Sequence, residues 1–187
     1  LAQKHKKKRI LYIAFNKSLI TEIKDKLITQ NIRNLIPKTF DALLYSLFIS
    51  LNKREPHITD LKPVTLQNYH PWFVGKPYKL KEFYCKSLSK FCNDPNLNDI
   101  EKFNFEKFGK KQPLLEQLWA KVKDNSLVTF ETIRKQAYIN NWFRDYIDNE
   151  YDMIMIDETQ DFDMIMLNML LKDTQIPKIF VGDPMQS

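Results

Sequence analysis

Glycine is scarce in this chain, with three residues among 187. A phosphate-binding loop of the form G-x-x-x-x-G-K-[S/T] needs two glycines and a Lys followed by Ser or Thr. Gly75 and Gly109 are each followed by Lys, but by neither Ser nor Thr, and no glycine stands five residues before them. The 187 residues therefore contain no loop of this kind to cradle a phosphate.

Cysteine is also nearly absent, because Cys85 and Cys92 are the only two. This usage excludes a disulfide framework and is typical of a reducing compartment. A zinc site would need further ligands, and His57 and His70 are too distant and too irregularly spaced to supply them.

Long apolar runs are missing too, so no membrane-spanning segment is expected. The chain starts with Leu, and its first residues, LAQKHKKKRIL, lack the apolar core of a signal peptide. We therefore expect the chain to begin and end inside a longer protein.

The residues that are present predict a globular chain, with 43% hydrophobic and 28% charged residues. Its length favours one domain with an insertion. Charge is unevenly distributed: residues 1–51 carry a net charge of +7, residues 52–145 carry +6, and residues 146–187 carry −7. Basic early segments and an acidic last one fit a polyanion-binding surface beside a metal site, although lysines on a merely solvated face are an alternative for the middle segment.

The first segment alternates between strand and helix patterns. The continuous apolar run Ile10–Phe15 predicts a buried strand, and Asn16 or Ser18 can cap the helix that follows. A second short strand is expected over Asn31–Pro37, and Thr39 is the expected cap of the next helix.

The alternation stops between residues 52 and 145. We expect Pro56–Pro77 to be irregular and three helices to follow it. Thr129 is a plausible helix start without a full capping box. The expected helices are Tyr78–Phe91, Leu114–Val122 and Thr129–Ile147. All three tryptophans, Trp72, Trp119 and Trp142, lie here, and at helical spacing such rings more often form core than stack on bases.

The last segment reads as strand, helix, strand, over Met153–Ile156, Met164–Leu171 and Ile179–Val181. Asp157, Glu158 and Asp161 follow the first of these strands. A carboxylate held at the end of a buried strand can meet Mg²⁺, and its neighbour can orient or deprotonate a water. The plainer alternative is that these acids cap the next helix.

Four stretches together resemble one family. DETQD (157–161) resembles the Walker B box of the UvrD-like superfamily-one helicases, and VGDPMQS (181–187) resembles their motif III in the form typical of the F-box DNA helicase branch. AFNKSLITEIKDKL (14–27) resembles motif Ia. KTFDALLYS (38–46) resembles motif Ib, but Asp41 and Ala42 replace its usual His and Ser, so the contact of that His is in doubt.

The resemblance implies an α/β fold: an incomplete RecA-like P-loop NTPase core with a parallel sheet and a mostly helical insertion, the 1B-like subdomain. Residues 1–51 and 146–187 would form parts of the RecA-like domain, and 52–145 the insertion. It also implies that the phosphate loop precedes residue 1 and that the second RecA-like domain follows residue 187.

For function, the resemblance implies an ATP-dependent DNA helicase that uses Mg²⁺ and acts on single-stranded and duplex DNA inside the cell, in the nucleus if the source is eukaryotic and otherwise in the cytoplasm. Asp157 would bind Mg²⁺ with Glu158 beside it, Glu158 would activate water, and Gln186 would sense the outer phosphate of the nucleotide. The residues that would contact DNA are Phe15, Asn16, Lys17, Lys38, Thr39 and Phe40.

Two other classes stay open. One is a nucleic-acid-binding module without ATPase activity, because the chain has no phosphate loop. The other is a metal-dependent nuclease using Asp157, Glu158 and Asp161, which would need further acids or a Lys around the metal. The chain alone is expected to be inactive as an ATPase.

Overall fold

The structure, a computed structural model, describes residue 2 and residues 7–103 and 112–181. Its centre is a sheet of four strands in the order β2-β1-β3-β4, and all three pairings are parallel. The strands are β1 (Ile10–Ala14), β2 (Leu35–Thr39), β3 (Met153–Ile156) and β4 (Lys178–Phe180). The α/β class and the parallel sheet expected from the sequence are confirmed.

Helices make up most of the remaining described structure. They are α1 (Lys17–Thr29), α2 (Phe40–Asn52), α3 (Tyr78–Asn93), α4 (Gln112–Lys123), α5 (Phe130–Ile139), α6 (Trp142–Glu150) and α7 (Met164–Asn168), which continues as a π-helical turn over Met169–Asp173. Short 3-10 turns cover Leu66–Asn68, Pro71–Phe73, Ile100–Lys102 and Thr159–Asp161.

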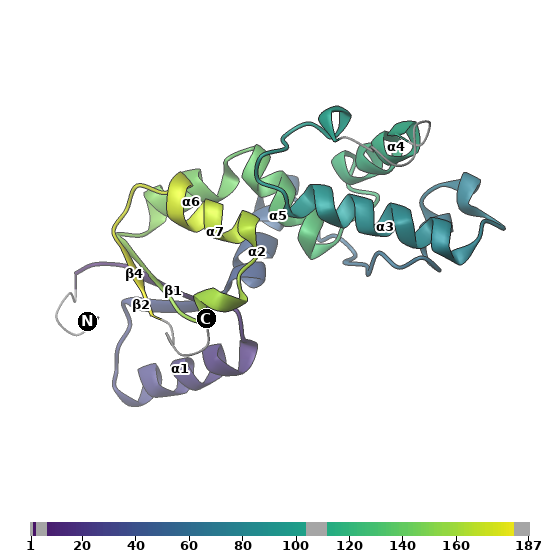
Figure 1. The fold of residues 1–187 in the computed structure, drawn as a ribbon. Helices are drawn as coiled ribbons and strands as arrows, with labels where there is room; N and C mark the ends of the chain where they lie inside the picture. The colour runs from purple at the N-terminus through teal and green to yellow at the C-terminus, as the bar shows by residue number, and fades with distance from the viewer. Residues whose placement is uncertain (1, 3–6, 104–111, 182–187) are drawn as a thin grey trace.

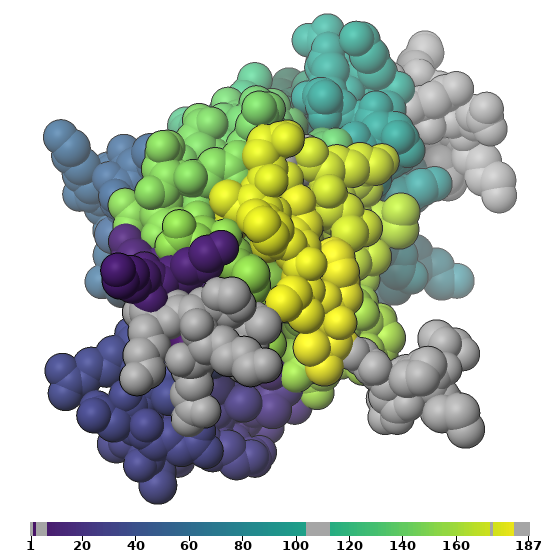
Figure 2. Space-filling view, turned by 90° about the vertical axis from the view of Figure 1, so that its left-hand side faces the viewer, coloured from purple at the N-terminus to yellow at the C-terminus, as the bar shows by residue number. Residues whose placement is uncertain are grey.

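The sheet is covered on both faces, as parallel sheets usually are. Successive residues of β1 alternate: Leu11 and Ile13 join the core formed with α2, α5, α6 and α7, while Tyr12 and Ala14 pack with Ile20 of α1. Helix α1 therefore lies alone below the sheet in Figure 1. Figure 2 shows the C-terminal segment, in yellow, lying against the green residues of α5 and α6.

A second core lies in the insertion. Its buried residues run from Leu66 to Leu127 and come from α3, α4 and the turns around them. From Val128 onward, buried residues such as Ile133 and Phe143 belong to the core against the sheet instead. Helix α5 and the first residues of α6 fall within the expected insertion, 52–145, but these helices cover the sheet as well.

Element positions agree with the sequence in most cases, and the differences have local causes. Strand β2 starts four residues later than expected and extends to Thr39, with Pro37 tolerated because β2 is an edge strand. The helix expected over Thr129–Ile147 is two helices, because Asn141 adopts a left-handed conformation with φ 56°.

The start of α5 corrects one expectation. A capping box was not expected at Thr129 because no Glu or Gln stands three residues later. In the structure Thr132 fills that role: its backbone N–H donates to Thr129 Oγ1 (3.1 Å), and the Thr129 N–H donates to Thr132 Oγ1 (2.8 Å). A threonine hydroxyl can therefore close the box as an acidic side chain would.

The tryptophans do not share one environment. Trp119 is 6% exposed in the insertion core and Trp142 is half-buried against Phe48, as expected for core residues. Trp72 is 36% exposed. None of the helices in the described part of the chain is both long and apolar enough to cross a membrane.

Candidate functional site

Three strands end at the same edge of the sheet, because they are parallel and in register. Ala14 of β1 pairs with Thr39 of β2, and Ile13 pairs with Ile156 of β3. Asp157 continues this alignment, since its N–H donates to the Ile13 carbonyl at 2.8 Å. The acidic loop after β3 therefore lies beside the turn at which β1 leads into α1. Open α/β sheets bind ligands at this edge.

Both oxygens of the Asp157 carboxylate accept a hydrogen bond. The Tyr12 hydroxyl donates to Oδ2 at 2.5 Å, and the Glu158 N–H donates to Oδ1 at 2.9 Å. Tyr12 and Asp157 reach each other because they share one face of the sheet. Burial, and then the hydrogen bond to the negative carboxylate, raise the pKa of the Tyr12 hydroxyl well above its usual range. Tyr12 thus stays a proton donor and fixes the orientation of Asp157.

Glu158 adopts a left-handed conformation, φ 53° and ψ 45°, which is strained for a residue with a side chain. Its Oε2 is buried and has no hydrogen-bond partner among the described residues. Such strain costs on the order of 1–3 kcal/mol, and an unsatisfied buried oxygen adds to the cost. Both features are found together at sites where a side chain is reserved for a ligand or a reaction.

Helix capping does not account for these acids. The side chain that caps α7 belongs to Asp163, whose Oδ1 accepts from the Met166 N–H at 2.9 Å. Glu158 precedes the 3-10 turn Thr159–Asp161 but makes no capping hydrogen bond to it, and Asp161 is exposed.

The residues expected to contact DNA fall into three groups. Phe15 and Lys17 are exposed at the exit of β1, and Lys38 is partly exposed near the end of β2. Asn16 and Thr39 cap α1 and α2, accepting from Ser18 N (2.9 Å) and Ala42 N (3.2 Å). Phe40 is 1% exposed, so its ring lies in the core.

Phe162 connects these turns to the acidic loop. Its buried ring lies edge-on to Phe15, with 6.2 Å between the centroids, and edge-on to Phe40, at 5.9 Å. The two turns and the loop after β3 therefore share one aromatic contact.

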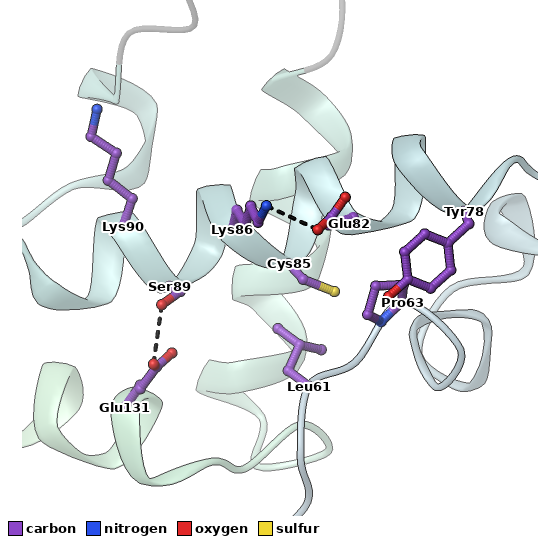
Figure 3. A pocket seen from close by; sticks show the side chains of 9 residues that line it. All are labelled: Leu61, Pro63, Tyr78, Glu82, Cys85, Lys86, Ser89, Lys90 and Glu131. Carbon is purple, nitrogen blue, oxygen red and sulfur yellow. Dashed lines mark hydrogen bonds and ion pairs between the residues drawn. The ribbon is translucent and has the colours of Figure 1, made fainter.

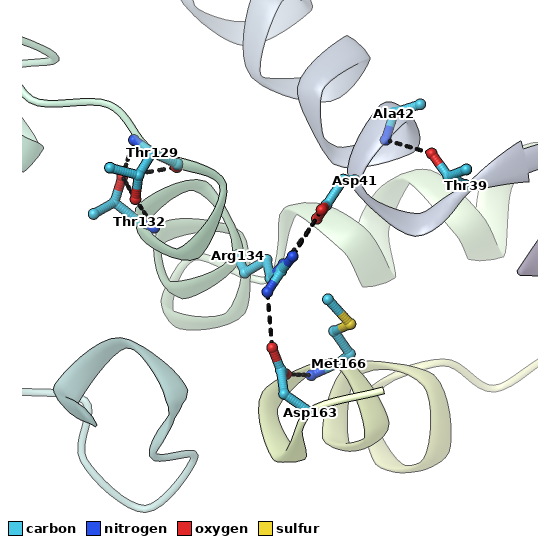
Figure 4. Close-up of polar contacts among 8 residues, drawn as sticks. All are labelled: Thr39, Asp41, Ala42, Thr129, Thr132, Arg134, Asp163 and Met166. Carbon is cyan, nitrogen blue, oxygen red and sulfur yellow. Dashed lines mark hydrogen bonds and ion pairs between the residues drawn. The ribbon is translucent and has the colours of Figure 1, made fainter. Parts of the chain in front are cut away.

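Arg134 of α5 connects the start of α2 to the start of α7 by ion pairs. Its guanidinium donates to both Asp41 oxygens at 2.7 Å and to Asp163 Oδ2 at 2.9 Å, as Figure 4 shows. Asp41, which replaces the His of motif Ib, is thus engaged in an ion pair, as is the capping residue of α7. Side-chain exposure is 12% for Arg134, 28% for Asp41 and 25% for Asp163, so the three charges are mostly removed from water.

A pocket of about 460 Å³ lies elsewhere, along α3 in the insertion (Figure 3). Its two acids are already engaged, Glu82 with Lys86 at 2.9 Å and Glu131 with Ser89 at 3.0 Å. It contains none of the residues at the strand edge and belongs to a different part of the molecule.

Comparison with known proteins does not assign the chain. No protein-family model matches it, and no curated protein matches it. The site is therefore interpreted from its own geometry.

Two carboxylates stand at this edge, those of Asp157 and Glu158. No group of three or more His, Cys, Asp or Glu side chains suited to a metal occurs in residues 2, 7–103 and 112–181. Mg²⁺ in proteins is usually held by one or two carboxylates together with waters and the phosphates of a substrate, and two carboxylates are what the described residues offer here. Gln186, the expected phosphate sensor, lies outside the described residues.

Sequence reasoning missed Tyr12, Phe162 and Arg134. Tyr12 and Phe162 read as ordinary apolar positions, and Arg134 as one of many cations on a helix. Only the pairing of β1 with β3 indicates that Tyr12 and the acid after β3 share a face.

Proposed function

We propose that this chain is part of the first RecA-like domain of a UvrD-like, ATP-dependent DNA helicase. The observation that carries the proposal is the arrangement at Asp157 and Glu158. The Asp157 carboxylate is oriented by two donors, and Glu158 has a left-handed backbone and one buried oxygen without a partner among the described residues. The order in the sequence of the boxes resembling motifs Ia, Ib, II and III supports it. The first three of these boxes each begin at the carboxyl end of a strand of one parallel sheet.

The two acids have different tasks in this proposal. Asp157, held by Tyr12, would bind Mg²⁺, while Glu158 would accept the proton of the attacking water. When bound, Mg²⁺ neutralises charge that develops on the transferred phosphoryl group. The chain's own contribution is position, because the Tyr12 hydroxyl and the Glu158 N–H orient the Asp157 carboxylate.

The neighbouring turns would hold the single strand. Lys17 and Lys38 would contact phosphates and the exposed ring of Phe15 would meet a base. Asn16 and Thr39 would act through their capped helix starts, where backbone N–H groups can bind a phosphate. DNA binding and the acidic loop would communicate through Phe162, which contacts both Phe15 and Phe40.

Glu158→Gln in the full-length protein tests the catalytic assignment. We expect nucleotide binding to persist and the hydrolysis rate to fall by about 10²–10⁴-fold, because a positioned base is lost. The measurements are steady-state phosphate release with single-stranded DNA and titration of a fluorescent ATP analogue. Asp161→Asn, which removes an exposed acid three residues away, is the control and should change neither. A hydrolysis rate of Glu158→Gln within twofold of the parent would refute the assignment.

A nucleic-acid-binding module without ATPase activity is the second candidate, favoured by the missing G-K-[S/T] loop. The two candidates differ in one measurement on the full-length protein, since only the helicase binds ATP at all. The 187 residues alone should release no phosphate under either.

A further inference from the structure

The end of the insertion farthest from the sheet exposes apolar and aromatic side chains. Trp72 is 36% exposed, Tyr78 59%, Val64 62% and Val74 63%. In the sequence these residues lie just before the N-terminal end of α3 or at it, and that end of α3 lies at the right of Figure 1. With Lys76 and Lys79 they form what we call the tip surface.

The tip surface is built on a fixed support. Phe73 is fully buried and its ring lies 5.1 Å from that of Tyr84, between the centroids. The Trp72 ring lies edge-on to Phe73 at 5.2 Å. Gly75, with φ +68°, turns the chain between Val74 and Lys76, in a conformation that disfavours a side chain. The Trp72 ring is therefore held in place by the buried rings of Phe73 and Tyr84.

Charge on this segment has a single sign. Residues 61–81 contain four lysines and neither Asp nor Glu, whereas the whole chain has 23 acidic residues. Lys62 pairs with Asp60 at 2.9 Å, and Lys81 donates to Gln67 at 3.1 Å. The Lys76 ammonium lies 4.9 Å from the centre of the Trp72 ring, and within the described residues Lys79 has no ion pair. The tip surface thus combines two lysines, Lys76 and Lys79, without an ion pair among the described residues and two partly exposed rings, those of Trp72 and Tyr78.

We propose that the tip surface binds single-stranded nucleic acid. Rings and ammonium groups alternate along the segment as Trp72, Lys76, Tyr78 and Lys79, and a single strand alternates bases and phosphates in the same way. Bases would stack on the two rings, and the phosphates would meet the lysines. An acidic peptide would use the lysines but leave the exposed rings and valines in water.

This contact goes beyond the proposed ATPase and needs no nucleotide. It is separate from the strand edge, because Phe73 and Tyr84, which lie beneath Trp72, belong to the second core and not to the core of the sheet. The pocket of Figure 3 opens beside it, with Tyr78 and Pro63 at one end, so the surface continues along α3.

The test compares two triple variants of the chain. The tip variant is Tyr78→Ala with Lys76→Ala and Lys79→Ala; Trp72 is kept because its ring supports Phe73. The control, Phe130→Ala with Lys24→Ala and Lys172→Ala, removes one exposed ring and two exposed lysines elsewhere. Binding of a fluorescein-labelled 20-nucleotide oligothymidylate is followed by anisotropy against salt, without ATP, and melting temperatures check folding.

We expect the tip variant to bind at least 10-fold more weakly than the parent and to lower the slope of log K against log[salt] by roughly 1.4, or 0.7 for each lysine. The control variant should bind the oligonucleotide with an affinity within twofold of that of the parent. Unchanged binding by the tip variant overturns the proposal. So does tighter binding of a polyglutamate peptide than of the oligonucleotide, which would indicate an acidic protein partner, or equal binding of a 20-base-pair duplex. None of these outcomes depends on ATP hydrolysis, so failure here leaves the ATPase proposal standing.

Discussion

The Asp157 carboxylate shows how one side chain of a strand determines the position of another. Tyr12 lies on β1 and Asp157 follows β3, yet they meet because the two strands are neighbours and both side chains point to the α1 face. A carboxylate at the end of a strand has several rotamers available to it. The hydroxyl at 2.5 Å and the Glu158 N–H at 2.9 Å select one. The protein itself thus holds the Asp157 carboxylate in one orientation, as the proposed role of Asp157 requires.

Tyr12→Phe removes this hydroxyl and little else. We expect it to lower the free energy of unfolding by about 1–2 kcal/mol, because a hydrogen bond to a charged group is lost in a mostly buried place. Urea unfolding of the parent and of Tyr12→Phe measures this change in the free energy of unfolding. Tyr45→Phe is the matched control, since the Tyr45 hydroxyl donates to Glu55 at 3.2 Å on the surface and should matter less. If both variants lose the same stability, the Tyr12 hydroxyl does not hold Asp157.

Helix α5 links the two cores of the molecule through neighbouring residues. Arg134 binds Asp41 and Asp163 on the side of the sheet. Lys135, fully buried, donates to the carbonyls of Asp94 (2.6 Å) and Leu97 after α3 and lies 4.6 Å from the centre of the Phe91 ring. The helix therefore connects the insertion to the elements that carry the motif resemblances.

Arg134→Ala should be much more destabilising than the loss of an exposed pair. It leaves Asp41 and Asp163 without their cation in a place largely shielded from water, and we expect a loss of about 2–4 kcal/mol. Arg9→Ala, which breaks a pair with Glu150 exposed by 55% and 41%, should cost less than about 1 kcal/mol. Chemical unfolding of the parent and of both variants measures the two losses in the free energy of unfolding. Equal losses would show that the ion pairs of Arg134 with Asp41 and Asp163 contribute no more to stability than an exposed ion pair does.

Lys135 predicts a dependence on pH. Burial lowers the pKa of its ammonium from the ordinary 10.5 to about 8. Between these values the unfolded chain binds a proton that the folded chain has released, so this group makes the free energy of unfolding rise as the pH rises from about 8 to 10.5. Burial raises the pKa of the Cys85 and Cys92 thiols and of the buried tyrosine Tyr84, so these groups ionise first in the unfolded chain and lower the free energy of unfolding in the same window. They do so in the parent and in the variant alike. The quantity to measure is therefore the difference in the free energy of unfolding between the parent and Lys135→Met.

That difference should shift in favour of the parent as the pH increases through this window, and stay constant below it. Denaturant midpoints at several pH values between 7 and 10.5 provide the measurement. A constant difference throughout would mean that Lys135 keeps its ordinary pKa when folded.

Much of this element-scale picture could be predicted from the sequence, and its limits have physical causes. Continuous apolar runs predicted β1 and β3, because a strand buried on both faces leaves an unbroken pattern. The break at Asn140 and Asn141 could not be predicted, since the periodicity continues through it and only the left-handed φ of Asn141 ends the helix. Long-range partners such as Arg134 with Asp41, or Tyr12 with Asp157, leave no local signal in the sequence. They are far apart along the chain, and only the fold brings them together.

At the scale of the whole molecule, charge is arranged in regions of opposite sign. The first 51 residues carry +7 and the last 42 carry −7. In the fold these two parts are not separate, because β1 pairs with both β2 and β3. The acidic loop therefore lies at the same sheet edge as the exposed Lys17. Under the proposed function, a polyanion at this edge would be attracted by the exposed Lys17 and repelled by the Asp157 carboxylate unless a cation neutralises that carboxylate.

This arrangement predicts which lysines near the edge matter for DNA. Lys17→Ala with Lys38→Ala, in the full-length protein, should weaken oligonucleotide binding and lower the slope of log K against log[salt] by roughly 1.4, because two phosphate contacts no longer release counterions. Lys24→Ala with Lys172→Ala changes the net charge equally but lies away from the edge, and should leave the slope unchanged. Equal effects of the two pairs would mean that only overall charge attracts DNA. An effect of neither, combined with loss of binding in the tip variant, would place the single strand on the insertion and away from the carboxyl ends of the strands.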